Sequence, residues 1–484
     1  MKMELPEDVS LIIRKLENAG YEAFAVGGCV RDTILGRNPQ DWDITTSAKP
    51  LQIKNLFTKT IDTGIKHGTV TVMLHKVGYE VTTYRIDGEY EDNRHPKSVE
   101  FTQNLKLDLE RRDFTINAMA YNDTRGLVDE FAGMQDIENK VIRCVGNPGE
   151  RFDEDALRML RAVRFSGQLG FQIEEKTRQA IEERAENLKN ISAERIRVEL
   201  TKLLVSKGAG QLRTAFETGM TKVFLPEFDK AMLCEQNNHH HIATVGEHAI
   251  RSVENMNAFF YGQKITDEKT AHCEWAKTAA NNIKKLVAPL SEKQHSILCV
   301  TMLLHDIGKP ETKTTDENGT GHFYGHPAQG EKMAAKILRR LTFDNETTDI
   351  ARKLIRWHDY QFEEGEKAMR KSVAKIGRDI MPLLFLVQYS DILAKNPAIL
   401  EEKIKRLNQC VAVWKTVMDS NAALELKELA ITGSDLIAMG IKAGPEIGKN
   451  LKNVLEYVLD NPQKNEKEVL LEYVREKMQE SGGE

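Results

Sequence analysis

Residues 26–46, VGGCVRDTILGRNPQDWDITT, decide the expected fold of the N-terminal region. The short apolar run at 24–26 predicts a strand, and Gly27 and Gly28 follow it where a helix would begin. Glycines at such a turn let backbone N–H groups approach a phosphate, because no Cβ stands in the way. The stretch therefore predicts a strand, a phosphate-binding turn and a helix, although an ordinary turn is the more common role of a glycine pair.

Two carboxylates in the same stretch, Asp41 and Asp43, carry the strongest chemical signal. Residues i and i+2 of a strand point to one face, so the two side chains would converge. Hard oxygen ligands on one face suit Mg²⁺, and two metals about 3.5–4 Å apart are usual for phosphoryl displacement. Glu80 begins another predicted strand and could supply a third carboxylate. The pattern predicts a magnesium site, with a purely structural Asp-x-Asp as the alternative.

The rest of the chain divides into a mixed region and a helical region. Further strands are predicted at 42–45, 69–74 and 80–85, whereas helical periodicity begins after 147–149 and continues to the C-terminus. We expect an α+β protein with a small mixed sheet and helices in a head over 1–145. An all-helical part would follow, with a neck over 146–232, a metal-binding module over 233–396 and a tail over 397–484.

The composition is typical of a cytoplasmic protein. No run of about 18 apolar residues is present, so no membrane span is expected, and the six cysteines form no CxxC pair. The net charge of −5 argues mildly against a nucleic-acid partner, but a basic patch can lie within an acidic total. Between Arg195 and Arg213 five basic residues face one acid, Glu199, which fits an RNA-facing stripe or a solvated helix. The sequence does not indicate an oligomeric state.

Three further motifs follow in order: RRDFTINAMAY at 111–121, EDALRMLRAVRF at 154–165 and ISAERIRVEL at 191–200. With residues 26–46 they resemble the class II tRNA nucleotidyltransferase and bacterial poly(A) polymerase family, whose head is polymerase-β-like. One departure is DEFAG at 129–133, where the family usually has DPFGG. The resemblance implies template-independent addition and repair of the 3′-terminal CCA of tRNA, with CTP, ATP and Mg²⁺.

The resemblance also implies roles for individual residues. Catalysis and Mg²⁺ binding would fall to Asp41 and Asp43, with Glu80 as a further catalytic carboxylate. Nucleotide binding would involve ten residues: Gly27, Gly28, Arg31, Arg112, Asp113, Asn117, Asp155, Arg158, Arg161 and Arg164.

Two of these pairs make physical sense by their spacing. Asp113 and Asn117 would be neighbours on a helix and could bind a ribose hydroxyl, or form a helix cap. Asp155 and Arg158, at i and i+3 of the next helix, offer an acceptor and a fork of donors. Cytosine and adenine share an amine beside an unprotonated ring nitrogen, so one such pair could accept both. Guanine or uracil would leave groups unpaired at roughly 1–3 kcal/mol each; a surface ion pair is the alternative.

Other activities within and outside the family stay open. Residues 85–96 resemble the flexible loop of members that complete CCA, and 428–474 resemble the tail that holds the body of the tRNA. An A-adding tRNA nucleotidyltransferase or a poly(A) polymerase is the nearest alternative. A protein uridylyltransferase, or a chain in which only a phosphodiesterase module is active, is more distant.

Ten of the thirteen histidines lie between His239 and His358, which indicates a separate module. His248, the pair His305-Asp306 and Asp391 resemble the metal-ligand set of HD-superfamily phosphohydrolases, and His326 and His358 resemble the extra ligands of two-metal members. Lys309 could meet a phosphate. The resemblance implies a divalent metal of unknown identity and hydrolysis of phosphoesters at RNA ends, with a degenerate, structural HD fold as the alternative.

Overall fold

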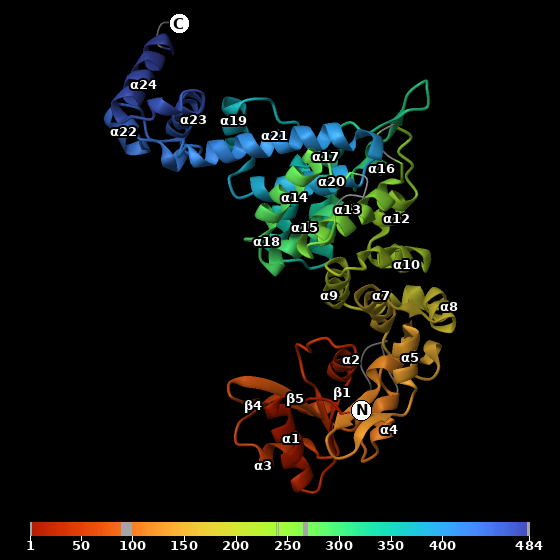
Figure 1. Cartoon of the computed structure of the whole chain (residues 1–484). Coiled ribbons are helices and arrows are strands. Elements are labelled where there is room, and N and C mark those ends of the chain that lie inside the picture. The colour runs from red at the N-terminus through yellow and green to blue at the C-terminus, as the bar shows by residue number, and fades with distance from the viewer. Residues whose placement is uncertain (1, 89–98, 239, 241, 265–269, 482–484) are drawn as a thin grey trace. The chain divides into compact units, whose positions relative to one another are not determined.

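The computed structural model describes residues 2–88, 99–238, 240, 242–264 and 270–481, and it divides into two compact units. Unit 1 covers Met1–Pro226 and unit 2 covers Glu227–Glu484 (Figure 1). The four-part division predicted from the sequence stays a prediction inside these two units. Most of residues 85–96, which resemble the family's flexible loop, lie outside the described residues.

Unit 1 begins with a seven-stranded mixed sheet, as predicted, in the order β3-β4-β5-β2-β1-β8-β9. Only the central pair β2 and β5 runs parallel; its neighbours pair antiparallel. The predicted strands are present, whereas β3, β8 and β9 were not predicted. The strands are β1 Ala23–Val26, β2 Ile44–Thr46, β3 Thr60–Gly64, β4 Thr69–Leu74, β5 Val77–Thr83, β8 Met119–Asn122 and β9 Gly126–Asp129.

Short helices and a hairpin complete the head. The core joins Phe24 and Val26 of the sheet to Leu105 and Leu109 of α4, which places α4 against the strands that carry the site. Helix α1 buries the stripe Val9, Ile12, Ile13 and Leu16. The elements are α1 Glu7–Asn18, α2 Gly28–Ile34, α3 Pro50–Leu56, α4 Leu105–Glu110 and α5 Gly133–Asn139, with the hairpin strands β6 Arg85–Asp87 and β7 Val99–Phe101.

The second half of unit 1 is helical, with one exception. Strand β10 Val141–Ile142 pairs in parallel with β11 Gln172–Ile173, so the prediction of an all-helical neck is wrong in this detail. Helix α7 packs closely on α9 and on the segment that follows it, because a Cβ on Gly167 would come within 2.9 Å of Leu203 and 2.7 Å of the Gly208 oxygen. The helices are α6 Pro148–Glu154, α7 Leu157–Leu169, α8 Glu175–Arg184, α9 Ala193–Leu204, α10 Leu212–Glu217 and α11 Met220–Phe224.

Over its described residues, unit 2 is helical apart from one small hairpin, β12 Thr314–Thr315 with β13 Gly321–His322. Helices α15 and α20 are buried along almost their whole length, so they form its centre. The helices of this part of the chain are α12 Pro226–Met232, α13 Val245–Phe260, α14 Glu274–Val287, α15 Glu292–Leu304, α16 Lys309–Thr312, α17 His326–Arg340, α18 Asn345–Trp357, α19 Glu366–Ile376, α20 Met381–Leu393 and α21 Leu400–Asp419.

A smaller apolar core follows α21. It joins Leu436, Val454, Val458 and Leu470 of α22 Gly433–Ala438, α23 Pro445–Asp460 and α24 Lys467–Ser481. Arg370 of α19 donates to the Leu459 carbonyl at 2.7 Å, which ties this end to the rest of the unit. Within the described residues, no helix is both long and apolar enough to cross a membrane.

Candidate functional site

Three carboxylates converge at the middle of the head sheet. Asp41 and Asp43 were predicted to lie on a strand. Strand β2 starts at Ile44, so both residues lie just before it instead. Val26 nevertheless donates to the Asp43 carbonyl at 3.0 Å, which keeps this segment extended beside β1. Because Ile44 pairs with Val81 on β5, the register sets Asp43 beside Glu80.

These carboxylates repel one another. Burial raises the pKa of Glu80, and the charges of Asp43 and Asp41 raise it further. Asp43 keeps exposed surface, but protein atoms crowd its carboxylate, and this partial burial raises its pKa. Arg112 opposes that rise and Asp41 adds to it. A cation between the three would remove the repulsion, which is the electrostatic character of a metal site.

The glycine turn brings two arginines to the start of α2, and the predicted phosphate contact of its N–H groups stays a prediction for Gly28. Gly27 has φ +83, in the left-handed region that favours glycine. Its N–H donates to the Met119 carbonyl at 3.1 Å, so it is not available to a phosphate. A Cβ on Gly27 would meet Arg112 at 3.2 Å, and one on Gly28 would lie 3.7 Å from Arg31. The turn thus lets two arginines approach the start of α2.

Asp113 and Asn117 meet, although on a 3₁₀ turn instead of the predicted helix. Asn117 donates to Asp113 at 3.1 Å, and Arg161 of α7 forms an ion pair with Asp113 at 2.7 Å. Burial alone would raise the pKa of Asp113, but Arg161 and the Asn117 hydrogen bond outweigh it and hold that pKa far below the usual range. Asp113 therefore stays ionised and fixes Arg161.

Three arginines surround one aromatic ring that was not predicted as a site residue. Arg31, Arg161 and Arg164 lie over the Phe165 ring at 4.9, 5.4 and 3.9 Å from its centre. Arg31 also donates to Asn117 at 2.6 Å, and buried Arg164 pairs with Glu199. Sequence spacing places Arg158, Arg161 and Arg164 on one helix face, but it does not reveal that Arg31 joins them.

The side chains of Asp155 and Arg158 have different ion-pair partners. Asp155 lies in the break between α6 and α7, so the prediction of one helix carrying both residues is wrong. It pairs with Arg195 of α9 at 2.7 Å, whereas Arg158 pairs with Glu154 at 2.6 Å and donates to the Arg111 carbonyl at 2.9 Å. Each side chain is thus held in place by its partners. A nucleotide base could replace one of these partners and bind the polar atoms of Asp155 and Arg158.

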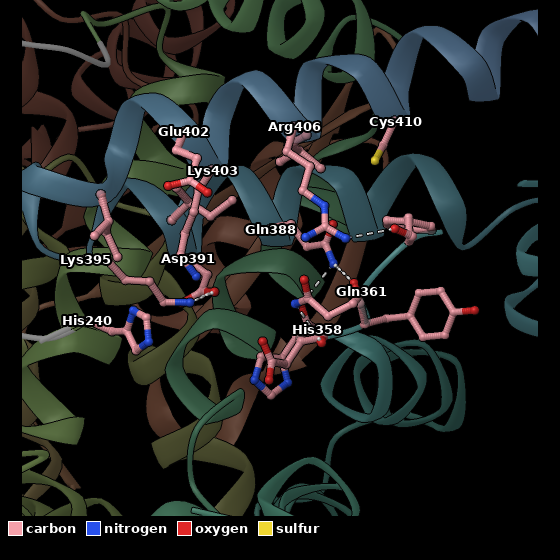
Figure 2. A pocket seen from close by; sticks show the side chains of 16 residues that line it. His240, His358, Gln361, Gln388, Asp391, Lys395, Glu402, Lys403, Arg406 and Cys410 are labelled. Atoms are coloured by element: carbon pink, nitrogen blue, oxygen red, sulfur yellow. Dashed lines mark hydrogen bonds and ion pairs between the residues drawn. The ribbon is translucent and has the colours of Figure 1, made fainter. Parts of the chain in front are cut away.

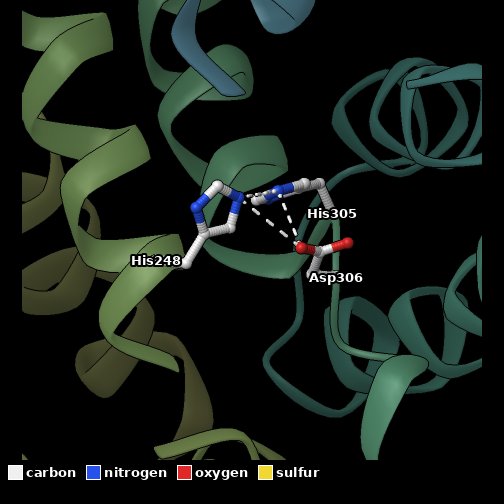
Figure 3. A group of neighbouring side chains, drawn as sticks. All are labelled: His248, His305 and Asp306. Carbon is white, nitrogen blue, oxygen red and sulfur yellow. Dashed lines mark hydrogen bonds and ion pairs between the residues drawn. The ribbon is translucent and has the colours of Figure 1, made fainter. Parts of the chain in front are cut away.

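The six predicted residues of the second module come together in unit 2. Figure 3 shows His248, His305 and Asp306 of this group; their ligand atoms lie within 4.8 Å of one another, as do those of Asp306, His326 and His358. One Asp306 oxygen lies 3.3 Å from His305, and the other lies 3.4 Å from both His326 and His358. Asp391 is 2.9 Å from His248. Asp306 therefore bridges two adjacent groups of donors, which we call the histidine–aspartate cluster.

The backbone fixes the orientation of these imidazoles. Nδ1 of His305, His326 and His358 lies 2.7, 2.8 and 2.7 Å from the carbonyls of Met302, Phe323 and Ile355, and Nδ1 of His248 lies 3.4 Å from that of Ala394. Since a carbonyl only accepts, Nδ1 carries a proton in each imidazole, and Nε2 is the nitrogen left for a metal. All four Nε2 atoms face the cluster, which is how metal-binding histidines are oriented.

Two lysines offset the negative charge of the cluster. Lys309 lies 2.7 Å from Asp306 and Lys395 lies 2.6 Å from Asp391. Burial would raise the pKa of each carboxyl, but these lysines and the histidines hold both well below the usual range. Burial lowers the pKa of His248 and His358, whereas the two aspartates overcome burial at His305 and raise its pKa to about 9. Lys395 was not predicted, because nothing but its i+4 spacing from Asp391 marks it.

Family models match three stretches of the chain. The poly A polymerase head domain matches residues 23–143, a model described as "Probable RNA and SrmB-binding site of polymerase A" matches 170–232, and domain 2 of tRNA nucleotidyltransferases matches 326–474. These stretches lie in both units.

Similar proteins carry one name. The chain is 36% identical over 405 residues to a CCA-adding enzyme of Limosilactobacillus reuteri, covering 82% of this chain and 96% of the relative. It is 33% identical over 482 residues to one of Levilactobacillus brevis, covering 97% and 99%. The crystal structure of the Bacillus stearothermophilus CCA-adding enzyme in complex with CTP is 30% identical, with a TM-score of 0.67 over 99% of this chain and all of that one. The chain therefore belongs to the family of CCA-adding enzymes, which are nucleotidyltransferases.

Proposed function

We propose that this protein adds and repairs the 3′-terminal CCA of tRNA in the cytoplasm, using CTP and ATP without a template. The observation that carries the proposal is the convergence of Asp41, Asp43 and Glu80 beside the arginines around Phe165. The likeness to the CTP-bound enzyme, at 30% identity over the whole chain, supports CTP as a substrate. The names of the relatives favour CCA addition over an A-adding or poly(A) activity.

The carboxylates fit Mg²⁺, because three hard oxygen donors meet where burial, and then the charges of neighbouring carboxylates, raise the pKa of Asp43 and Glu80. Bound there, Mg²⁺ would acidify the attacking hydroxyl and neutralise charge on the triphosphate. Asp41 and Asp43 would hold it, with Glu80 as a third ligand or base.

The remaining steps are binding and positioning. The 3′-oxygen of the tRNA forms a bond to the α-phosphorus, and the bond to the pyrophosphate oxygen breaks. Arg31, Arg112 and Arg164 are placed to bind the triphosphate, because their guanidinium groups gather at the start of α2 and around Phe165. Holding the reacting groups in line supplies most of such catalysis.

Base selection is assigned to Asp155 and Arg158. Asp155 accepts from Arg195, and Arg158 donates to Glu154 and a carbonyl. An incoming cytosine or adenine would exchange with these partners, its amine donating to Asp155 and its ring nitrogen accepting from Arg158. Guanine or uracil would place donor against donor.

Nucleotide incorporation into a tRNA that lacks CCA tests the proposal. With CTP alone we expect two additions, and with CTP and ATP together three. Addition of A alone to a CC-ending tRNA, with no use of CTP, would identify an A-adding enzyme. Long tails from ATP would identify a poly(A) polymerase.

We propose a second activity, metal-dependent hydrolysis of phosphoesters at RNA ends, at the histidine–aspartate cluster. The observation that favours it is four Nε2 lone pairs and two carboxylates in a buried group. This donor set fits divalent transition metals, whose affinity for imidazole exceeds that of Mg²⁺. Asp306 has one oxygen toward each of the two groups of donors, so it would contribute to holding a metal in both. A bound cation would lower the pKa of its water and so supply the nucleophile.

Hydrolysis of a 2′,3′-cyclic nucleotide tests this activity with Ni²⁺, Co²⁺, Mn²⁺ and Mg²⁺ in turn. We expect turnover that needs a metal and is lost in the double variant His305→Ala with Asp306→Ala. If wild type turns over neither this nor other phosphoesters, the cluster is a structural element. Equal turnover in the variant would place the activity elsewhere.

A further inference from the structure

A cavity of about 340 Å³ lies beside the histidine–aspartate cluster, and His358 and Asp391 of the cluster line it. The facing wall comes from α21, whose residues Lys403 and Arg406 are three apart and so share one helix face. Figure 2 shows Lys395 reaching Asp391, and Arg406 pointing from α21 toward Gln361. The volume falls within the range of small-ligand sites, about 300–1,000 Å³.

The two cations that α21 contributes to this wall, Lys403 and Arg406, are not used by the cluster, in contrast to Lys395. Lys395 is only 10% exposed and already pairs with Asp391. Among the described residues, neither Lys403 nor Arg406 forms an ion pair; Arg406 donates one hydrogen bond, at 3.1 Å, to the Phe362 carbonyl. Asp359 and Glu402 also line the cavity; both are exposed, and their charges act on Lys403 without forming an ion pair with it.

An anion in this cavity would be favoured on electrostatic grounds. Burial lowers the pKa of Lys403 and the nearby charge of Lys395 lowers it further, and these two effects outweigh the opposing charges of Asp391, Asp359 and Glu402. A ligand phosphate would offset both effects and accept from the free donors of Arg406, which suits a guanidinium group.

We infer that Lys403 and Arg406 bind a second phosphate of the substrate whose first phosphate reacts at the cluster. This inference rests on the proposed hydrolase activity and specifies its substrate class. The substrate is an RNA 3′ end with a cyclic phosphate at the cluster and the preceding internucleotide phosphate on α21. Water supplies the oxygen that bonds to phosphorus, one ester P–O bond of the ring breaks, and the released ribose oxygen takes a proton.

Binding of adenosine 3′,5′-bisphosphate and adenosine 3′-monophosphate to the full-length, Mn²⁺-loaded protein, measured by calorimetry, tests the inference. We expect wild type to bind the bisphosphate at least about tenfold more tightly. The double variant Lys403→Met with Arg406→Met should lose most of this preference. Lys405→Met is the matched control, since Lys405 is exposed on the same helix and pairs with Glu401 at 2.7 Å. Any nucleotide that binds in the head contributes equally to all variants.

Equal affinity for the two nucleotides in wild type, or a preference that survives in the double variant, would overturn the inference. Thermal unfolding checks that each variant folds, and Lys403→Arg should retain the preference because it keeps the charge. Hydrolysis of a 2′,3′-cyclic nucleotide is measured on the same preparations. Turnover without tighter binding of the bisphosphate would overturn the phosphate site on α21 alone. Tighter binding of the bisphosphate without turnover would support the phosphate site and contradict the proposed hydrolase activity.

Discussion

The two candidate metal sites of this chain are built in opposite ways. In the head, Asp41, Asp43 and Glu80 stand exposed at a sheet; partial burial raises the pKa of Asp43 and of Glu80, and the charge of Asp41 raises both further. In unit 2 the donors are buried, the imidazoles are fixed by backbone carbonyls, and each aspartate has its own lysine. An open, repulsive site gains its cation together with an anionic substrate, whereas a buried, neutralised site is preorganised to retain one. The difference predicts that a metal bound in unit 2 would exchange more slowly than a metal bound in the head.

The largest expected effect is on catalysis in the head. Asp41→Ala or Asp43→Ala should reduce nucleotide addition by about 100-fold or more, because each removes a ligand for the cation that stabilises the transition state. Addition of CMP to trimmed tRNA measures it. Asp62→Ala is the control, since Asp62 is an exposed residue of the same sheet that pairs with Lys54 at 2.9 Å. Activity above about a tenth of the wild-type rate in either variant would contradict the site.

The second prediction concerns stability in unit 2. In protein freed of metal, Asp391→Asn should destabilise the unit by about 3–5 kcal/mol, because it leaves buried Lys395 without its counterion. The pKa of Asp391 lies well below its usual range, so its contribution is present above about pH 4 and lost as the pH falls further. Urea unfolding measures the loss, with exposed Asp379→Asn as the control. A loss that does not shrink below pH 4 would count against the ion pair.

The third prediction is a change in base selection. Asp155→Ala and Arg158→Ala should each weaken discrimination against UTP and GTP by about tenfold, since roughly 1–3 kcal/mol per unpaired group is at stake. Relative kcat/KM values for the four nucleotides measure it. Arg178→Ala serves as the control, because Arg178 pairs with Glu217 on the surface of α8. Full selectivity in both variants would show that other residues read the base.

The smallest expected effect is on the stability of unit 1, and its sign tells a repulsive carboxylate site from a paired one. Asp43→Asn should slightly stabilise unit 1 in the absence of Mg²⁺, because the pKa of Asp43 is raised and its ionised form is therefore disfavoured in the folded state. By the same reasoning, the destabilising effect of ionised Asp43 on the wild-type fold decreases as the pH is lowered toward 4. Thermal midpoints with and without Mg²⁺ measure it. A lower midpoint for Asp43→Asn would mean that the carboxylate is paired after all.

Motifs within one segment could be predicted from the sequence, whereas partners from distant segments could not. The ligand order His248, His305, Asp306 and Asp391 predicted residues that the fold does gather. The pairing of Asp155 with Arg195 joins residues 40 apart and depends on how α7 and α9 pack. Lys403 and Arg406 fell in the predicted tail, since helical periodicity alone does not show that α21 faces Asp391.

The close contact between Gly167 and Gly208 makes the position of helix α7 sensitive to any side chain at residue 167. A Cβ at 167 would come within 2.7 Å of the Gly208 oxygen and 2.9 Å of Leu203 on α9, so α7 would have to shift. Arg158, Arg161 and Arg164 lie on that helix, so one added methyl group would displace together the partner of Asp113 and the two residues proposed to read the base and to bind the triphosphate. Inherited variation at this position would therefore impair the enzyme without altering a single group that takes part in the chemistry.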